Sequence, residues 1–241
     1  SGPEAIRHEF DAKATMKDMW ETYLPAFEAL VTEADVESVM GAYNRTNGEP
    51  CCGHHYLMEE VLRGKWKFDG HFVSDCWAIK DFHENHKITK NARESAALAL
   101  KRGCDVNCGN TYLHLLGAVE DGLITEEDIT RSAERALTAR YLLGLFEGSE
   151  YDKIPYEKVE CKEHIEEALN VARKGCVLLK NDGVLPLDKS KIKTIGVVGP
   201  NADSRAALIG NYHGTSSRYI TVLEGIQDEV GEDVRVLYSQ G

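Results

Sequence analysis

Short apolar runs that alternate with helical patterns constrain the fold of this chain more than any other feature. Each run is bracketed by Gly, Asn or Asp, and each helical pattern repeats apolar residues every three or four positions. This alternation is typical of βα units, whose strands pair in parallel. We expect helices at 15–33, 55–64, 91–102, 112–120 and 126–143, and strands at 36–43, 71–75 and 103–109.

Local signals mark several of these boundaries. Thr15 stands three residues before Asp18, and Thr125 stands three residues before Asp128, so both pairs predict capping boxes. Gly144 ends the last of these helices. A complete (β/α)8 barrel takes about 250 residues, and roughly three βα units fit before residue 146, so a barrel here would be incomplete.

A second α/β segment follows a stretch without periodicity. Residues 147–160 carry charge and Pro155, and we interpret them as a linker. After it, the pattern predicts a helix at 161–174 and strands at 176–180, 194–199 and 234–238.

The composition argues against two classes of partner. The chain has 241 residues and a formal net charge of −12, and no basic patch stands out that could neutralise phosphates. No apolar run approaches the length of a membrane span, and no charged and then apolar leader opens the sequence. We therefore expect neither nucleic acid nor membrane as a partner.

The cysteines form no familiar framework. Their number is seven, and their spacing matches no small secreted disulfide pattern, which favours a reducing, cytoplasmic compartment. The run Cys51-Cys52-Gly53-His54-His55 collects residue types that bind metals. Adjacent cysteines chelate one ion poorly, however, and no second pair completes a tetrahedral set, so we expect no metal site.

The segment Gly70–Ile79 places an acid at the end of a buried strand. Phe72 and Val73 supply the apolar, β-branched character, and Asp75 follows them. Active sites of α/β folds gather at the carboxyl ends of the strands. An Asp in this place can instead cap the following helix, so position alone leaves both interpretations open.

Motifs for other chemistries are absent or incomplete. Gly196-Val-Val-Gly199 follows a predicted strand, but the run is not Gly-x-Gly-x-x-Gly, and Pro200 lacks the N–H donor that a phosphate needs. The sequence has no Gly-x-Ser-x-Gly motif, and His83 and His86 match no zinc-protease helix. A nucleotide-binding α/β protein is therefore the weakest hypothesis.

Four side chains together suit a sugar site, namely Asp75, Tyr43, Trp77 and Arg7. A carboxylate can attack an anomeric carbon, aromatic faces stack on pyranose rings, and an arginine donates to hydroxyls. Structural alternatives stay open: both aromatic residues could be core, and the arginine could pair with Glu4 or Asp11 at the surface.

Several stretches, taken together, resemble glycoside hydrolase family 3. They occur in the family's order and are Ser1–Ala12, Glu21–Phe27, Val39–Asn44 with Asn47–Gly48, Phe72–Cys76, Asp105–Gly109, Cys176–Leu187 and Ile195–Ala202. Each motif is weak alone, but the ordered combination is specific and covers nearly the whole chain. The Ser-Asp-Cys and Asp-Val-Asn-Cys-Gly forms are most similar to the β-xylosidase and β-glucosidase branch.

The resemblance implies a retaining, exo-acting enzyme that hydrolyses β-linked xylosyl or glucosyl residues of oligosaccharides or aryl glycosides. Asp75 matches the family nucleophile, and Tyr43, Met40 and Arg7 match positions in the same pocket. Many members carry Trp directly after the nucleophile, where this chain has Cys76. Trp77 comes one residue later, and because neighbours on a strand face opposite ways, its stacking role is open.

The resemblance also implies a longer parent enzyme. Residues 1–146 would form the C-terminal portion of a TIM-like barrel, 147–160 a linker, and 161–241 the beginning of an α/β sandwich domain. The family's Lys-His motif and its acid/base Glu fall outside this chain, so the remainder of the parent polypeptide is an expected partner. The family demands no metal or organic cofactor. The alternative is a non-catalytic carbohydrate-binding or scaffold fragment.

Overall fold

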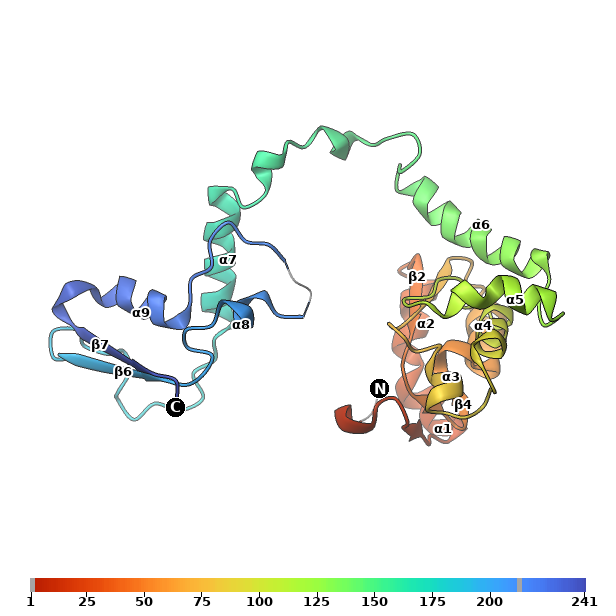
Figure 1. Ribbon diagram of the computed structural model, residues 1–241, viewed down its shortest axis with the longest axis horizontal. Helices are drawn as coiled ribbons and strands as arrows, with labels where there is room; N and C mark the ends of the chain where they lie inside the picture. The colour runs from red at the N-terminus through yellow and green to blue at the C-terminus, as the bar shows by residue number, and fades with distance from the viewer. Residues whose placement is uncertain (1–2, 212–213) are drawn as a thin grey trace. The chain divides into compact units, whose positions relative to one another are not determined.

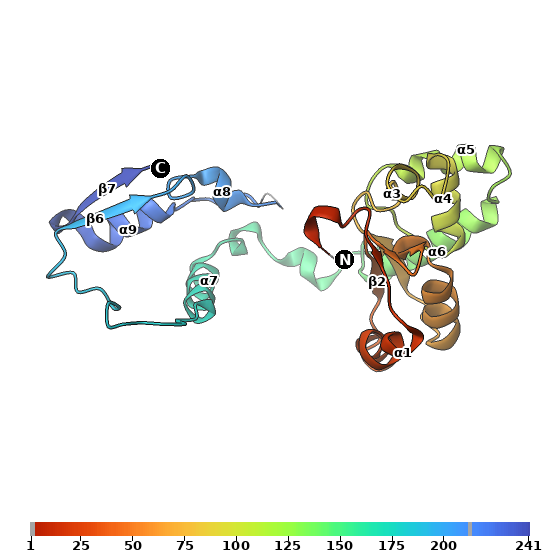
Figure 2. The same ribbon diagram turned by 90° about the horizontal axis from the view of Figure 1, so that it is seen from below.

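The computed structural model describes residues 3–211 and 214–241, and it divides the chain into two compact units, Ser1–Glu150 and Tyr151–Gly241. Helices and strands alternate in both units, which confirms the predicted α/β class (Figures 1 and 2). The first unit contains η1 Glu4–Ile6, β1 Asp11–Ala12, α1 Met16–Asp18, η2 Met19–Tyr23, α2 Pro25–Thr32, β2 Ser38–Gly41, β3 Arg45–Thr46, β4 Glu49–Pro50, η3 Cys51–Gly53, η4 His55–Lys65, β5 His71–Ser74, α3 Asp81–Glu84, α4 Ala92–Lys101, η5 Thr111–His114, α5 Leu115–Glu120 and α6 Glu126–Leu142. In the second unit lie η7 Tyr156–Lys158, α7 Lys162–Gly175, β6 Thr194–Val198, α8 Arg205–Ile209, α9 Val222–Val230, η8 Gly231–Asp233 and β7 Arg235–Ser239, after η6 Glu150–Lys153 at the boundary.

A parallel pair of strands, β2 and β5, is central to the first unit. Their register sets Gly41 opposite Ser74, so both strands end at the same edge. Gly41 is required there, because a Cβ atom would lie 2.6 Å from the sulfur of Cys52 and 2.9 Å from the ring of Phe72. Because Gly41 has no side chain, the strand pair can pack directly against Cys52 and Phe72 of the core.

The strand predicted at 103–109 is wrong in extent. A single bridge joins Val106 to Val73 of β5, and no ladder follows. Gly103 and Gly109, with φ angles of +93° and +135°, turn the backbone away on either side. The segment still extends the carboxyl edge of the strand pair by one position.

The predicted helix at 15–33 is three consecutive helical pieces. The capping box of Thr15 and Asp18 is present, as expected. The middle piece, η2, is a π-helix, and Pro25 then occupies the first position of α2. Proline lacks an N–H donor, so it suits the start of a helix better than the interior.

The sequence patterns did not predict a small sheet formed by β1, β3 and β4. Strands β3 and β4 form a hairpin whose turn residues, Asn47 and Gly48, have φ angles of 51° and 95°. An Asn-Gly pair in this conformation is typical of a two-residue hairpin turn. Strand β1 adds in parallel to β3 and ties the N-terminal segment to the hairpin.

Two apolar clusters hold the first unit together. The larger one lies between the β2–β5 pair, η4, the turn after β5 and α3, where Ile79 of the turn and Phe82 of α3 are almost completely buried. The smaller one lies between α4 and α5, which Figure 2 shows side by side, and contains Leu100, Ala118 and Ile124. Burial of such side chains contributes about 1.5–3 kcal/mol each.

A buried carboxylate joins helix α6 to this core. The Asp105 side chain is completely buried and accepts hydrogen bonds from Arg63 at 2.8 Å, Arg135 at 3.1 Å and the Phe72 amide at 2.9 Å. Such a group is stable when buried only if it is paired and hydrogen-bonded. The three donors come from η4, α6 and β5, so Asp105 fixes three elements at once.

The second unit is built on the parallel pair β6–β7, with Thr194 opposite Arg235 (Figure 1). Helix α9, which begins with a capping box of Thr221 and Glu224, packs beside β7. The strand predicted at 176–180 is wrong, because this segment has no strand conformation and its apolar residues are exposed. Within the described ranges, no helix is long and apolar enough to cross a membrane.

Candidate active site

The residues that follow β2 and β5 meet at the common carboxyl edge of these strands. The Asp75 amide donates to the Gly41 carbonyl at 3.1 Å, and the Ser74 amide donates to the Val106 carbonyl at 2.9 Å. These bonds place Asp75 beside the loop that carries Tyr43. The ends of β2 and β5 and the segment at Val106 therefore meet at the backbone around Asp75.

Asp75 itself lies half-buried between the end of β5 and the turn that begins at Cys76. Its Oδ1 atom accepts a hydrogen bond from the Cys76 amide at 2.7 Å. The alternative role as a helix cap is wrong, because α3 begins at Asp81 with Lys80 at its N-cap position. Among the described residues, the Tyr43 hydroxyl is a second hydrogen-bond partner of this carboxylate.

Tyr43 is a direct neighbour of this carboxylate. Burial and then the charge of Asp75 raise the pKa of the Tyr43 phenol, so its hydroxyl stays a neutral donor. The Tyr43 side chain is also partly buried against the larger core cluster. The core role that the sequence left open for Tyr43 is therefore partly correct. The two residues form a donor–carboxylate pair at the strand edge.

Arg7 reaches the same place from the N-terminal segment. Its guanidinium lies 5.1 Å from the centre of the Tyr43 ring, a distance that suits a cation–π contact. Arg7 also forms an ion pair with Glu4, which is the surface pairing that the sequence left open. The sequence-predicted residues Arg7, Tyr43 and Asp75 are therefore brought together.

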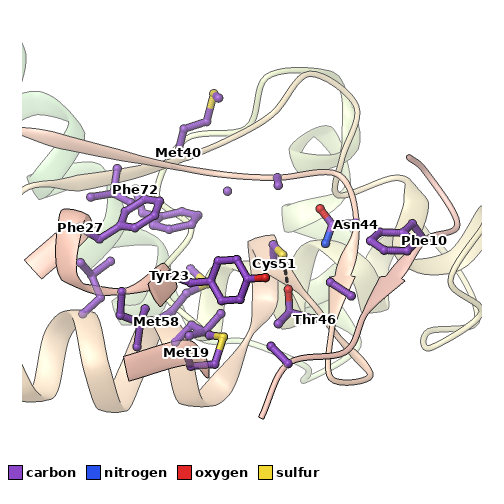
Figure 3. Close-up of a pocket in the computed structure, with 18 of the residues that line it drawn as sticks. Phe10, Met19, Tyr23, Phe27, Met40, Asn44, Thr46, Cys51, Met58 and Phe72 are labelled. Carbon is purple, nitrogen blue, oxygen red and sulfur yellow. Dashed lines mark hydrogen bonds between the residues drawn. The ribbon is translucent and has the colours of Figure 1, made fainter. Parts of the chain in front are cut away.

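Met40 and Trp77 are not brought into this group. Met40 is 62% exposed, and its side chain extends away from Met19, Tyr23 and Met58 in Figure 3. Trp77 is 50% exposed. In the described part of the chain, no hydrogen bond or ring contact joins either residue to Asp75.

The argument from strand alternation does not apply to Trp77. Strand β5 ends at Ser74, so Trp77 lies in the turn with a φ angle of +70°. Its amide donates to the Cys108 carbonyl at 2.7 Å, which holds this uncommon conformation. The orientation of its indole is set by the turn and not by the pleat.

A disulfide between Cys76 and Cys108 lies directly beside Asp75. The expectation that the cysteines are reduced is wrong for this pair, and the reason for favouring a reducing compartment is lost with it. The sequence separation of 32 residues does not predict this disulfide. The pattern that could have predicted it is that Cys76 and Cys108 each follow a segment that ends at the same edge of the strand pair. The other five cysteines are free, and burial raises the pKa of the Cys104 thiol to about 12.

A cavity of about 530 Å³ lies next to the strand pair, lined by residues from η2, α2, β2 and η4 (Figure 3). Its walls are mostly apolar, with Lys13, Asn44 and Thr46 among the polar exceptions, and Asp75 does not line it. The cavity is therefore separate from the carboxylate group. Among residues 3–211 and 214–241, no cluster of three or more His, Cys, Asp or Glu residues could hold a metal ion.

Known proteins match this chain over both units. Residues 8–139 match the glycosyl hydrolase family 3 N-terminal domain, and residues 176–237 match the C-terminal domain of that family. The xylan 1,4-β-xylosidase of Xylanibacter ruminicola is 40% identical over 234 residues, which are 94% of this chain and 27% of that protein. The β-D-xylosidase 1 of Arabidopsis thaliana is 38% identical over 225 residues, 91% of this chain and 29% of that protein.

Solved structures agree with these sequence matches. An exo-β-xylosidase of the family, in complex with a xylobiose aziridine activity-based probe, superimposes with a TM-score of 0.82 at 33% identity, covering 98% of this chain and 31% of that one. A β-glucosidase from Listeria innocua in complex with glucose gives a TM-score of 0.78 at 31% identity, covering 98% and 33%. The chain thus spans about a third or less of the length of each of these relatives.

Proposed function

Because the chain belongs to glycosyl hydrolase family 3, we propose that the polypeptide carrying it is a retaining, exo-acting β-glycosidase. The proposal rests above all on Asp75, which lies at the carboxyl end of β5 beside the phenol of Tyr43. The substrate would be a β-linked oligosaccharide or aryl glycoside with a xylosyl or glucosyl residue at its non-reducing end. The xylosidases among the relatives support a xylosyl residue as the first to test.

In the proposed reaction, Asp75 is the nucleophile. Its carboxylate oxygen forms a bond to the anomeric carbon while the glycosidic C–O bond breaks, and an acid/base residue protonates the leaving oxygen. Water, deprotonated by the same acid/base residue, then attacks the anomeric carbon and releases the sugar and the Asp75 carboxylate. We propose that this acid/base residue is a Glu outside the present 241 residues.

Tyr43 and Arg7 have supporting roles in this proposal. The protonated phenol of Tyr43 donates toward the Asp75 carboxylate and orients it for attack. The guanidinium of Arg7, held over the Tyr43 ring, can donate to sugar hydroxyls. Met40 and Trp77 do not contact these groups, but both side chains are exposed, and we keep them in the proposal as substrate contacts.

The domain assignment is part of the same proposal. Residues 1–146 would be the C-terminal portion of a TIM-like barrel, residues 147–160 a linker, and residues 161–241 the beginning of an α/β sandwich domain. The match of the first unit to the family's N-terminal domain and of the second to its C-terminal domain supports this division. The remainder of the parent polypeptide would then complete both domains.

Covalent trapping tests the proposal directly. In a 2-deoxy-2-fluoro-β-xyloside with a 2,4-dinitrophenyl leaving group, the fluorine slows both steps and the good leaving group restores the first, so the glycosyl-enzyme accumulates and can be mapped by peptide mass spectrometry. We expect the label on Asp75 in the complete polypeptide, and a loss of turnover of roughly 10³-fold or more in Asp75→Asn. Asp69→Asn, which changes an exposed carboxylate just before β5, is the matched control.

Two outcomes would contradict the proposal. Substantial turnover by Asp75→Asn, or a label on another residue, would exclude Asp75 as the nucleophile. Binding of xylobiose by calorimetry without any hydrolysis by the complete polypeptide would instead indicate a non-catalytic carbohydrate-binding protein.

A further inference from the structure

A histidine that the sequence analysis did not single out lies in the Asp75 neighbourhood. His8 follows Arg7 in the N-terminal segment, and its ring centre is 4.5 Å from that of Tyr43 at an interplanar angle of 59°. Tyr43 is in turn the neighbour of Asp75, since the Asp75 amide bonds to Gly41 two residues before it. The imidazole thus lies one side chain away from the proposed nucleophile.

A buried carboxylate fixes the orientation of this imidazole. The Nδ1 atom of His8 lies 2.8 Å from Oδ2 of Asp81, whose side chain is 6% exposed. Because a carboxylate can only accept, Nδ1 carries the hydrogen and donates it. The other carboxylate oxygen of Asp81 accepts from Asn85 at 2.6 Å, so Asp81 is itself held in place.

The opposite edge of the imidazole is free. The His8 side chain is 39% exposed, and its Nε2 atom has no hydrogen-bond partner among residues 3–211 and 214–241. With Nδ1 committed to Asp81, Nε2 is an acceptor when the ring is neutral and a donor when it is charged. A sugar hydroxyl both donates and accepts, so it is a suitable partner in either state.

We propose that His8 contacts a hydroxyl of the sugar bound at Asp75, and that Asp81 is the positioning residue that holds His8 for this contact. The inference rests on the proposed function and adds a substrate contact to it. Two observations carry it. On one side of the ring, the buried Asp81 accepts hydrogen bonds from His8 and Asn85, and on the other side the Nε2 atom of His8 has no partner among the described residues. A histidine that only joined the N-terminal segment to the surface would not need its ring orientation fixed in this way.

The test uses the complete polypeptide and a series of substrates, 4-nitrophenyl β-xyloside and its 2-, 3- and 4-deoxy analogues. We expect His8→Ala to lower kcat/KM for the parent xyloside by about 10- to 100-fold, the usual range for a hydrogen bond to a polar or charged group. For one of the deoxy analogues, His8→Ala and the wild type should differ by less than about threefold, because the hydroxyl that His8 contacts is already missing. An equal loss on all four substrates would overturn the contact.

The role of Asp81 is tested by a double-mutant cycle. If Asp81 acts through His8, Asp81→Asn lowers kcat/KM in the same direction, and the double variant with His8→Ala is no worse than His8→Ala alone. Losses that add would overturn the positioning role. His71→Ala is the matched control, because His71 also bonds a carboxylate, that of Glu37 at 3.3 Å, at the opposite end of β5, and it should leave all four rates unchanged.

The two proposals fail in different ways. If Asp75→Asn loses turnover while His8→Ala keeps wild-type rates, the nucleophile stands and the His8 contact is excluded. If Asp75→Asn keeps turnover, the proposed function fails, and the His8 contact fails with it. Thermal unfolding of each variant shows whether a lost rate reflects a lost fold.

Discussion

Single residues at the carboxyl edge of β2 and β5 obtain their chemistry from neighbours that are distant in the sequence. Asp75 has its amide bonded to Gly41, and its charge acts on the phenol of Tyr43. Arg7 and His8 reach the same ring from the N-terminal segment. The reactivity that we propose for Asp75 therefore depends on side chains from two other segments.

Removal of the Tyr43 hydroxyl should reduce catalysis without removing the nucleophile. Tyr43→Phe removes one side-chain donor from the Asp75 carboxylate and leaves the Cys76 amide in place, and a hydrogen bond to a charged group contributes about 1.5–3 kcal/mol. We expect kcat/KM to fall by about 10- to 100-fold in steady-state kinetics of the complete polypeptide. Tyr141→Phe, at an exposed position of α6, should behave as the wild type; equal rates for both variants would argue against the donor role.

His86 should make the stability of the chain dependent on pH. Both of its ring nitrogens are buried without a hydrogen-bond partner among the described residues, and burial lowers its pKa below the ordinary 6.5. Below about pH 6.5 the unfolded chain therefore binds a proton that the folded chain does not. The contribution of neutral His86 to the free energy of unfolding is therefore fully present above that pH, and it is lost as the pH falls toward the lower pKa of the folded state.

The variant His86→Leu tests this dependence. It removes two unpartnered polar atoms, so its thermal midpoint near pH 7.5 should be unchanged or higher. Its loss of midpoint between about pH 7.5 and 5.5 should be smaller than that of the wild type. The exposed His114→Leu is the control and should keep the wild-type slope; an unchanged slope in His86→Leu would contradict the assignment.

Secondary-structure elements around the site are joined by more than packing. The turn after β5 and the segment after Val106 are linked by the Cys76–Cys108 disulfide, by the Trp77 amide, and by Ser74, whose hydroxyl accepts from the Cys108 amide at 3.0 Å. Asp105 then joins the same segment to η4 and α6. The loop that carries the proposed nucleophile is therefore restrained at several points.

Loss of the disulfide should destabilise the chain measurably. A bond that closes a loop of 32 residues contributes roughly 3–4 kcal/mol in the chain-entropy description. We expect the double variant Cys76→Ser with Cys108→Ser to unfold at a lower temperature, and a reductant to lower the wild type to the same midpoint while leaving the variant unchanged. Cys176→Ser, which changes an exposed free thiol, is the control.

Mass spectrometry checks the pairing itself. After unfolding without a reductant, five cysteines should react with iodoacetamide, and after reduction all seven should react. Seven alkylated cysteines in the unreduced sample would show that the pair is not formed.

At the scale of the whole molecule, the second unit buries far fewer side chains than the first. In its described residues, the buried side chains are Val197, Thr221 and Val234, whereas α7 contains none. Leu178 and Leu179 are 62% and 91% exposed. Apolar surface of this extent marks an interaction or aggregation surface.

The isolated 241-residue chain should therefore associate with itself. We expect sedimentation velocity to show concentration-dependent oligomers in the micromolar range. The double change Leu178→Lys with Leu179→Glu should reduce this association, whereas Lys180→Glu, a change at a neighbouring polar position, should not. A chain that stays monomeric at every concentration would contradict the expectation.

Local patterns were sufficient for much of this architecture. The capping boxes of Thr15 and Thr125, the extents of α4 and α6, and the strands β5, β6 and β7 follow from hydrophobic period and capping, which act over a few neighbouring residues. The acid at the end of β5 followed from the same patterns. Family motifs then indicated a sugar-processing enzyme, and the matches to both family domains agree with that.

Contacts between distant segments had no such local signal. The reduction of the 103–109 strand to one bridge, the Cys76–Cys108 bond, and the approach of His8 and Asp81 to Tyr43 all depend on which loops meet at the shared edge of β2 and β5. Backbone direction at Gly103, Gly109 and Trp77 sets that meeting. These features arise from long-range packing, because the free energy that selects them is gained only when segments far apart in the chain are already in contact.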